Sequence, residues 1–365
     1  MSKKIKVLHV QLTKNFGGIE SLLTNVYANI DRTKYQFDFI ATAEKPYQKK
    51  LKRMGGNIYL VPSIKQIISY IRQFNQILNN NYDIVHFHKN SAANIVPVLL
   101  AKYHFTHPKI IIHSHNTSPS MNNIGLLILH KLNRSFLDEI ADEKVACANV
   151  AANWMFRKKN DVQIINNGIN IDKFTYSYKA RNLIRRELHI SPDTFILGNV
   201  SRFSEQKNQS FLIDIFNAFE KKVPNSKLIL VGDGHLLKKI QKKVIALGLG
   251  SKVIFTGRQS NIPDYLSAMD VFVMPSLYEG LPISAVEAQA EGLQVLLSDT
   301  ISKEVILTNS TKLFSLKQTP SEIADMIINS SKCSDRKSGL ARVRNSYSLS
   351  STVKSFNDLY QGILK

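Results

Sequence analysis

The sequence has few of the features that mark secreted, zinc-binding or membrane-spanning proteins. Its only cysteines, Cys147 and Cys333, are far apart in 365 residues. They provide no disulfide framework and no zinc pattern, and they fit a reducing compartment. No apolar stretch approaches the roughly 18 residues needed to cross a bilayer. The apolar run near the N-terminus is short and contains His9 and Gln11, so we interpret it as a first strand rather than a signal peptide.

Several ligand-binding signatures are also missing. The sequence has no Asp-x-Asp pair, the usual carboxylate pair for a metal-bridged nucleotide diphosphate, and no Gly-x-Gly-x-x-Gly dinucleotide fingerprint. The net charge is +20. A charge of this size attracts nucleic acid, anionic lipid or polyphosphate substrates. No zinc finger, RNA-binding aromatic signature or recognition helix accompanies it, so we do not expect nucleic acid as a partner.

Apolar strands alternate with helical patterns along the whole chain. Hydrophobic residues make up 44% of it, which is enough for two cores. The alternation is typical of parallel sheets covered by helices on both faces. In the first half, we predict strands at 5–12, 36–41, 57–61, 83–88, 109–114, 143–147 and 162–165, and helices near 18–30, 64–80, 91–105, 122–140 and 149–158. In the second half, we predict strands at 195–200, 227–231, 252–255, 270–274 and 293–297, and helices near 208–221, 235–247, 261–268, 282–291 and 320–330.

The two halves are expected to join between Asn166 and Pro192. Asn166-Asn167-Gly168 is turn chemistry, because Asn and Gly tolerate positive φ. A polar stretch rich in Lys and Arg, 172–186, follows it. The sequence therefore predicts an α/β chain of two Rossmann-like, doubly wound domains, 1–172 and 173–345, that face each other across a cleft. A last helix at 346–365 would pack back toward the first domain, and ligands would bind at the carboxyl ends of the strands.

The strongest functional pattern is a pair of glutamates, Glu279 and Glu287, that follows an apolar strand. Pro282 suits the first turn of a helix, so Glu279 would lie in the loop before that helix and Glu287 inside it. Carboxylates accept paired hydroxyl donors well, which suits sugar recognition. Free amides near Gly280 and Leu281 suit a phosphate. A helix with an ordinary solvated glutamate is the alternative.

Cations and glycines follow other predicted strands. Arg202 and Lys207 could neutralise a diphosphate leaving group, although two ordinary surface cations would give the same pattern. Gly17-Gly18 and Gly232-Asp233-Gly234 are turns in which glycine lets backbone amides approach a phosphate. Each glycine turn is weak evidence by itself, because such connections often use Gly.

Four histidines end two predicted strands: His86 and His88, then His113 and His115. Residues i and i+2 share one face of a strand, so the four imidazoles could approach each other. A catalytic metal normally has a carboxylate or cysteine companion as well, and none is spaced nearby. We therefore predict no metal, and we take His115 as the active-site histidine. The alternative for any one of these histidines is a structural role, as an imidazole hydrogen-bonded at the sheet edge.

Together these patterns resemble the retaining glycosyltransferases of family 4, which have the two-domain GT-B fold. The resemblance covers nearly the whole chain, is most specific over 195–305, and is closest to enzymes of bacterial exopolysaccharide and capsule synthesis. Two departures, Glu291 before Gly292 and Gln294 where proline is common, concern a helix–strand junction more than the chemistry. The residues that carry the resemblance are Gly17-Gly18, His115, Asn167-Gly168, Arg202 with Lys207, Gly232-Asp233-Gly234, Phe255-Thr256-Gly257 and the pair Glu279 and Glu287.

The resemblance implies an acceptor domain at 1–172, a donor domain at 173–345, and a role for each matching residue. Arg202 and Lys207 would bind the donor diphosphate, and Glu287 would hold the ribose hydroxyls. Glu279 would contact the transferred sugar, and His115 would lie by its 6-position. The remaining donor-binding residues would be Gly17 and Gly18 near the β-phosphate, Gly232, Asp233 and Gly234, Arg258 at the base, and the backbone of Gly280, Leu281 and Pro282.

The implied reaction is front-face retention without metal or cofactor, in which a phosphate oxygen takes the acceptor proton. A hexose or N-acetylhexosamine would pass from a nucleotide diphosphate sugar, we expect a UDP-sugar, to a lipid-linked or polysaccharide acceptor. Three rival readings stay open. They are a nucleotide-sugar 2-epimerase of the same fold, a phosphorylase with lysine-bound pyridoxal phosphate, and a non-catalytic polyanion-binding protein.

Basic and apolar segments of the first domain predict an anionic membrane surface as a further partner. The stretch 45–53 carries five cations, and 121–137 places apolar residues beside Lys131 and Arg134 at helical spacing. The alternative is that this apolar face packs on the first sheet. We expect a cytoplasmic protein that associates peripherally with the inner face of the cell membrane.

Overall fold

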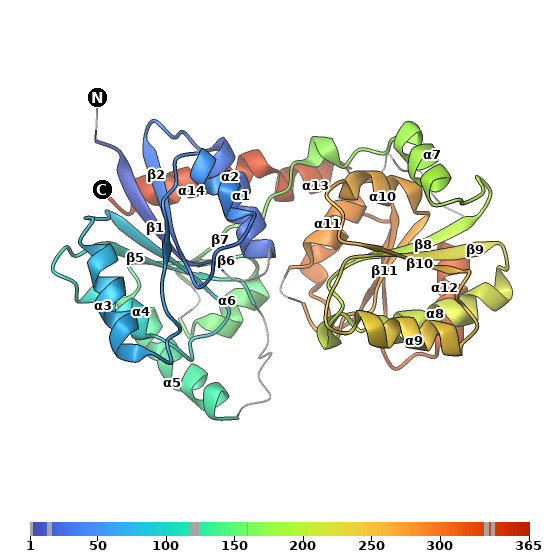
Figure 1. The fold of residues 1–365 in the computed structure, drawn as a ribbon, viewed down its shortest axis with the longest axis horizontal. Helices are drawn as coiled ribbons and strands as arrows, with labels where there is room; N and C mark the ends of the chain where they lie inside the picture. Colours follow the sequence, from blue (N-terminus) through green and yellow to red (C-terminus); the bar gives the residue numbers. More distant parts are fainter. Residues whose placement is uncertain are drawn as a thin grey trace. The chain divides into compact units, whose positions relative to one another are not determined.

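The chain folds into two compact units, one of which is built from two separate segments. This is a computed structural model that describes residues 3–12, 17–116, 124–158, 160–279, 281–331, 336 and 340–365. The first unit comprises Met1–Gly168 and Leu349–Lys365, and the second comprises Ile169–Ser348 (Figure 1). The expected boundaries were 172 and 345, so the structure moves both by a few residues. The final segment belongs to the first unit.

The first unit is a parallel sheet of seven strands in the order β3-β2-β1-β4-β5-β6-β7. Its strands are β1 (Ile5–Leu12), β2 (Tyr35–Ala41), β3 (Ile58–Leu60), β4 (Ile84–Lys89), β5 (Lys109–Ser114), β6 (Glu143–Ala146) and β7 (Val162–Ile164). Its helices are α1 (Gly18–Asn29), α2 (Gln48–Arg53), α3 (Ile67–Leu78), α4 (Val96–Lys102), α5 (Ile124–Ile140), α6 (Asn149–Met155) and α14 (Leu349–Gly362).

Helices cover both faces of this sheet, which explains why its strands are continuously apolar. One core receives Leu23 of α1, Leu51 of α2 and Phe356 of α14. The core on the other face receives Phe74 of α3 and Leu137 of α5, together with residues of α4 and α6. Helices α2 and α5 therefore pack on opposite faces of the sheet (Figure 1).

The second unit is a parallel sheet of six strands in the order β10-β9-β8-β11-β12-β13. Its strands are β8 (Phe195–Val200), β9 (Ser226–Val231), β10 (Val253–Gly257), β11 (Val271–Met274), β12 (Gln294–Ser298) and β13 (Thr311–Phe314). Its helices are α7 (Tyr178–Glu187), α8 (Gln209–Lys222), α9 (Leu237–Ala246), α10 (Ile262–Ala268), α11 (Ile283–Ala290), α12 (Pro320–Ser331) and α13 (Leu340–Tyr347), with short 3-10 turns η1 (Ile171–Lys173), η2 (Glu205–Lys207) and η3 (Lys303–Val305).

Both sheets reverse their strand order beside their first strand, between β1 and β4 and between β8 and β11. Such switch points open a crevice at the carboxyl ends of the strands, where doubly wound sheets bind ligands. Among the described residues, no helix is long and apolar enough to cross a membrane.

The twelve predicted strands all form, with ends within a few residues of those expected. Helix α7 is a correction, because we read 172–186 as a polar stretch. Ser177 caps the helix by accepting from the amide of Ala180. Arg181 and Arg185 then place their Nη2 atoms 2.7 and 2.9 Å from the two oxygens of Asp270. Both guanidiniums also donate to the Ala268 carbonyl, so pairing with Asp270 allows these basic residues to pack against the end of α10. Helices α2 and α13 and strand β13 were also missed.

Candidate functional site

The switch point of the second unit brings together two of the predicted catalytic residues. Lys207 ends η2 after β8, and Glu279 lies in the loop after the neighbouring strand β11. The Lys207 Nζ lies 2.5 Å from Glu279 Oε1, and the two side chains are 18% and 5% exposed. Gln206 Nε2 donates to the Tyr278 carbonyl at 3.0 Å and to Glu279 Oε2 at 3.3 Å. The two strand ends are thus joined by a nearly buried ion pair.

Arg202 lies in the loop between β8 and η2 and is exposed. Its backbone carbonyl accepts from Gln209 Nε2 at 2.7 Å, and the neighbouring Phe203 side chain is buried. Within the described part of the chain, the Arg202 guanidinium makes no hydrogen bond or ion pair. Its backbone is therefore anchored while its charge remains available to a ligand.

Gly232 and Gly234 permit close packing between the loops after β8 and β9. A Cβ at Gly232, where φ is 140°, would lie 2.0 Å from the Ser201 carbonyl oxygen. A Cβ at Gly234 would lie 2.3 Å from the Phe203 carbonyl oxygen. The Phe203 amide donates to the Asp233 carbonyl at 3.0 Å. These glycines hold the Arg202 loop in place, which is a packing role that the turn pattern did not predict.

The other donor-binding candidates of this unit lie in α11 or in the loops after its strands. Glu287 is half-buried in α11, and desolvation raises its pKa to about 8. Pro282 is the N-cap of that helix, one residue before the position we expected, and Leu281 packs on the core. Arg258 follows β10 and is exposed. Among the described residues, no hydrogen bond or ion pair joins Glu287 or Arg258 to Lys207 or Glu279. Gly280 lies outside the described residues.

The two departures from the family pattern lie at the end of α11. Glu291 is 1% exposed and accepts from the hydroxyl of Ser267, and its burial raises its pKa to about 7. Gly292 has φ of 76°, and a Cβ there would lie 2.1 Å from the carbonyl oxygen of Arg336. Gln294 begins β12 and is buried. All three residues belong to the helix–strand junction.

In the first unit, Gly17 and Gly18 lie at the start of α1, after β1. Gly17 is the N-cap residue, and its amide donates to Glu20 Oε2 at 2.9 Å. A Cβ at Gly18 would meet nothing within 4 Å, so packing alone does not require glycine there.

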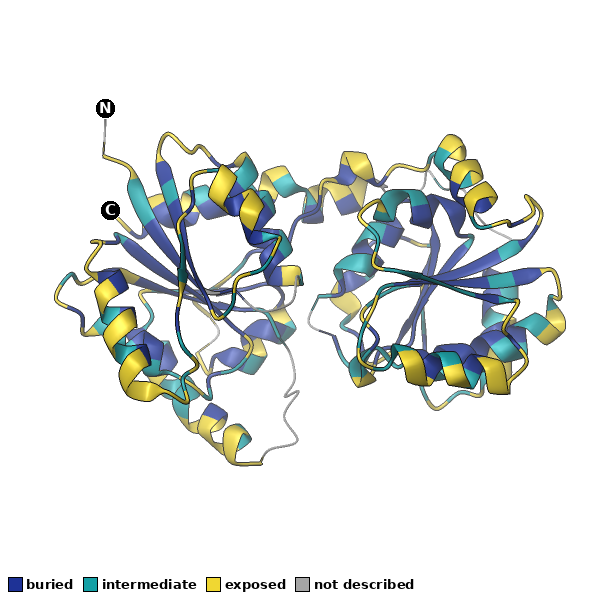
Figure 2. Ribbon diagram, viewed as in Figure 1, coloured by how far each residue is buried: buried dark blue, intermediate teal, exposed yellow. Residues whose placement is uncertain are grey.

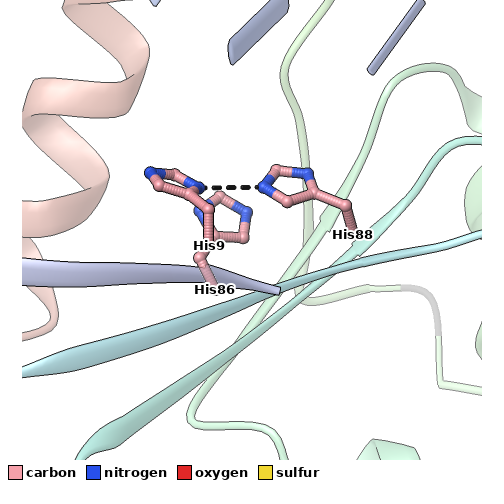
Figure 3. Close-up of side chains that lie close together, drawn as sticks. All are labelled: His9, His86 and His88. Carbon is pink, nitrogen blue, oxygen red and sulfur yellow. Dashed lines mark hydrogen bonds between the residues drawn. The ribbon is translucent and has the colours of Figure 1, made fainter. Parts of the chain in front are cut away.

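Five histidines gather on one face of the same sheet, in β1, β4 and β5 and directly after β5. His9 pairs in register with His86, and His88 with His113. His9 Nδ1 lies 3.0 Å from His88 Nε2 (Figure 3), and His88 Nδ1 lies 2.9 Å from His115 Nε2. The sequence reading omitted His9. The parallel pairing of β1 with β4, which brings it in, could not be read from the spacing of the other four.

Tyr360 extends this histidine network, and buried Lys89 follows the network residue His88 in β4. His86 Nδ1 lies 2.9 Å from the hydroxyl of Tyr360 in α14, and His86 Nε2 lies 3.2 Å from His113 Nδ1. Lys89 follows His88, is 6% exposed, and donates to the Asn94 carbonyl at 2.7 Å. Burial lowers its pKa to about 8.

All five imidazoles are neutral at pH 7. Desolvation lowers the pKa values of His9 and His115 to about 3. Burial, and then the neighbouring rings, lower the pKa values of His86, His88 and His113 far below the usual range. Within the described residues, no carboxylate hydrogen-bonds to any of these rings. The network therefore lacks the acid–base carboxylates that the 2-epimerase reading requires.

Two groups of three histidines have ring nitrogens within 4.8 Å of one another: His9 with His86 and His88, and His88 with His113 and His115. Zinc–nitrogen bonds of about 2.1 Å and tetrahedral angles place the ring centroids of two ligands roughly 5 Å apart. Each group instead contains a stacked pair. His86 and His88 lie 4.3 Å apart at 22°, and His113 and His115 lie 4.1 Å apart at 30°. The other four ring pairs of the two groups lie 5.1–5.4 Å apart, and two of them, His9–His88 and His88–His115, are hydrogen-bonded. Hydrogen bonds between rings therefore account for the contacts in this network.

Helix α5 carries an exposed apolar surface along most of its length. Six of its side chains are between 40% and 76% exposed: Ile124, Leu126, Ile128, Leu129, Leu132 and Phe136 (Figure 2). Leu137 and Ile140 face the core. The alternative that this apolar face packs on the sheet is therefore wrong for these six residues, while 121–123 lie outside the described residues. The four cations of α2 are exposed as well, but on the opposite face of the sheet.

Comparisons with known proteins agree with this architecture. Residues 180–342 match the family Glycosyl transferases group 1, and residues 16–173 match Glycosyltransferase Family 4. EpsF of Bacillus subtilis (strain 168), whose name assigns it to the glycosyltransferases, is 33% identical over 83% of this chain and 82% of EpsF. The UDP-Gal:alpha-D-GlcNAc-diphosphoundecaprenol alpha-1,3-galactosyltransferase of Escherichia coli is 23% identical over 84% of this chain and 82% of its own length.

A solved structure shows the same fold. The crystal structure of Anabaena Alr3699/HepE in complex with UDP and glucose has a TM-score of 0.83, covering 98% of this chain and 100% of that chain at 19% identity. The predicted fold class, two Rossmann-like doubly wound domains of the GT-B type, is confirmed. The chain belongs to the glycosyltransferases described by Glycosyl transferases group 1 and Glycosyltransferase Family 4.

Proposed function

We propose that this glycosyltransferase transfers a hexose or N-acetylhexosamine, with retention, from a UDP-sugar to a lipid-linked or polysaccharide acceptor in cell-surface polysaccharide synthesis. The observation that carries the proposal is the pair of Lys207 and Glu279, together with the exposed Arg202, at the β8–β11 switch point. The name of the Escherichia coli relative, with its UDP-Gal donor and diphosphoundecaprenol acceptor, supports it. The UDP and glucose in the Anabaena protein support a nucleotide-sugar donor.

The two cations would stabilise the departing diphosphate. A lysine ammonium has three N–H donors, and Glu279 occupies one of them, so the others can reach a phosphate. Glu279 holds the ammonium in place before the donor arrives, and Arg202 adds a second charge as the leaving group develops. Preorganised charge of this kind is among the largest contributions to catalysis. Glu279 would also accept from a hydroxyl of the transferred sugar.

The remaining assignments follow from the family pattern. Glu287 would bind the ribose hydroxyls, Arg258 the base, and Gly17-Gly18 and Gly232-Asp233-Gly234 the phosphates. His115 would contact the sugar. Since two side-chain cations supply the charge that a metal would otherwise provide, we propose a reaction without metal or cofactor. A phosphate oxygen takes the acceptor proton on the face from which the diphosphate leaves, so no protein nucleophile is required.

Nucleotide-sugar binding tests the donor assignment. A thermal-shift panel of UDP-, GDP- and ADP-sugars should show stabilisation by one class, because a ligand of the native state raises its stability. Arg202→Ala should weaken this stabilisation, whereas Lys239→Ala, which removes another exposed cation of the second unit, should not. If no nucleotide sugar stabilises the chain, or if both variants respond alike, the assignment is wrong. An epimerised sugar formed without acceptor would favour the 2-epimerase.

We also propose that the chain binds the inner face of the cell membrane through α5. Its six exposed apolar residues lie beside Lys131, and exposed Arg157 and Lys158 follow the neighbouring helix α6. Apolar residues that enter the lipid interface and cations that meet anionic headgroups are the two components of interfacial binding. A lipid-linked acceptor would then reach the first unit along the membrane.

Vesicle binding tests this surface. Leu129→Glu with Leu132→Glu should abolish sedimentation with vesicles that contain phosphatidylglycerol. The matched control reverses Lys49, Lys50, Lys52 and Arg53 of α2 to Glu, on the opposite face of the sheet, and should retain most binding. Loss of binding in the α2 variant with retention in the α5 variant would place the contact on α2 instead.

A further inference from the structure

The five histidines form two separate hydrogen-bonded chains. One runs from His9 through His88 to His115, and the other runs from Tyr360 through His86 to His113. The first chain reaches the residue that we propose to contact the sugar. The second ends at α14 and does not include His115.

The number of protons in the first chain determines its polarity. A neutral imidazole has one N–H donor and one acceptor nitrogen. Three rings therefore carry three N–H groups, and the two hydrogen bonds between rings use two of them. His88 cannot accept at both nitrogens, so both bonds run in the same direction. The third N–H must lie at one end of the chain, on His9 Nε2 or on His115 Nδ1.

The surroundings of the two ends decide between them. Both terminal nitrogens are buried and make no hydrogen bond with the described residues. His9 packs against Phe37 and Phe39 in the interior of the unit, and its ring centroid lies 4.4 and 5.4 Å from theirs. His9 is fully buried, whereas His115 is only partly buried and follows β5 at the edge where doubly wound sheets bind ligands. A buried N–H without an acceptor is costly, so we place the lone pair on His9. The third N–H then lies on His115 Nδ1, at the carboxyl end of the sheet.

We propose that His88 is a positioning residue that fixes His115 as the Nδ1–H tautomer, with that N–H offered to an oxygen of the transferred sugar. His88 does so by accepting from His9 and donating to His115, and it never touches the substrate. The inference rests on the proposed function for the role of His115. The tautomer itself follows from the hydrogen bonds within the first unit.

Nitrogen-15 NMR of the imidazoles in the full-length protein tests the tautomer directly. At pH 7.5, His115 should give the signals of an Nδ1–H ring. His88→Leu removes both bonds and should give His115 a mixture of tautomers. His86→Leu is the matched control, because His86 is as buried as His88 but belongs to the other chain. An Nε2–H signal for His115 in the wild type, or an equal change in both variants, would overturn the proposal.

Activity separates positioning from general damage. The kcat/KM for the donor should fall about tenfold in His88→Leu, as expected for one misplaced hydrogen bond, and less than twofold in His86→Leu. His88→Gln keeps a donor and an acceptor and should recover part of the loss. Equal losses in all three variants would refute positioning by His88. An Nδ1–H tautomer in a protein without transferase activity would refute the proposed function but leave the tautomer intact.

A shared metal ion is the competing explanation. Adding one equivalent of Zn²⁺ should leave the His88 and His115 signals in place. A stoichiometric shift of both signals would show that the network holds an ion, and would overturn the proposal.

Discussion

Lowering the pH from 7 to 5.5 should destabilise the first unit far more than the second. Five histidines of the first unit are at most 1% exposed: His9, His86, His88, His113 and His130. Burial lowers all five pKa values, to about 3 for His9 and to about 4 for His130, so the folded unit stays unprotonated over this range. In the unfolded chain their pKa is about 6.5. Their neutral burial is therefore tolerated above pH 6.5 and opposes folding as the pH falls below it.

Linkage converts this proton uptake into free energy. A histidine that takes up its proton on unfolding with a pKa of 6.5 costs about 1.3 kcal/mol of stability between pH 7 and pH 5.5. Five such residues cost about 6 kcal/mol, which is comparable to the whole stability of many domains. For a unit of this size the melting temperature should fall by about 15 °C or more.

The second unit should respond in the opposite direction. Burial raises the pKa of Glu291 to about 7. The folded state therefore takes up this proton before the unfolded chain does, and stability increases as the pH falls from 7 toward 4.5. Glu291 is 1% exposed, and it contributes about 1.5 kcal/mol between pH 7 and pH 5.5. The raised pKa of half-buried Glu287 acts in the same direction.

Trp154 makes the first unit observable by itself. It is the only tryptophan, it lies in α6, and it stacks on His130 at 3.9 Å. Thermal unfolding followed by its fluorescence reports the first unit, whereas far-UV circular dichroism reports both units. At pH 5.5 the fluorescence transition should precede most of the loss of circular dichroism. His9→Leu should reduce the pH dependence by about 1.3 kcal/mol, which is the contribution of one histidine.

The reasoning would fail on either of two results. A fluorescence transition that moves by less than about 5 °C between pH 7 and pH 5.5 would mean that these histidines are not buried as neutral rings. Equal shifts of the two transitions would mean that general acid effects, and not the histidine network, determine the response.

Three further outcomes are expected. Activity should survive excess EDTA, and a loss that Mn²⁺ restores would contradict the metal-free reaction. Lys207→Met should cost about 3 kcal/mol of stability as well as activity, because it removes the ammonium that faces nearly buried Glu279. Adding Glu279→Gln should restore much of the stability but not the activity. The coupling would be refuted if denaturant titration found both variants as stable as wild type. Gly232→Ala should destabilise the second unit by about 3 kcal/mol, because the new Cβ would clash with the Ser201 carbonyl. Gly248 also has positive φ but faces open space, so Gly248→Ala should cost about 1 kcal/mol. Equal losses of unfolding free energy in calorimetry would contradict the packing role of Gly232.

Local pattern predicted the elements of this fold well, because a buried parallel strand is a short apolar run and a covering helix has its own period. The missed helices show the limit of this approach. Helix α7 looked polar because Arg181 and Arg185 pack against the end of α10 and pair with Asp270, a partner some ninety residues away. Helix α2 contains four cations and buries Gln48 and Leu51, so its periodic signal is short.

The chemistry of the candidate site was partly visible in the sequence. Glu279, Glu287, Arg202 and Lys207 stood out because each follows a predicted strand, where doubly wound sheets bind ligands. The sequence did not show that Lys207 and Glu279 form one nearly buried pair, because that contact requires β8 and β11 to be neighbours in the sheet.

Tertiary structure alone decided the two features with most consequence in the first unit. The order β1-β4-β5 brings His9 to the other four histidines, and burial keeps the rings neutral and joins them through hydrogen bonds. From the sequence, the apolar residues of α5 were consistent with core and with surface. In the structure Leu137 and Ile140 are buried, while six apolar residues between Ile124 and Phe136 are exposed. Periodicity identifies that a helix has an apolar face, but the neighbours that cover or expose this face come from distant parts of the chain.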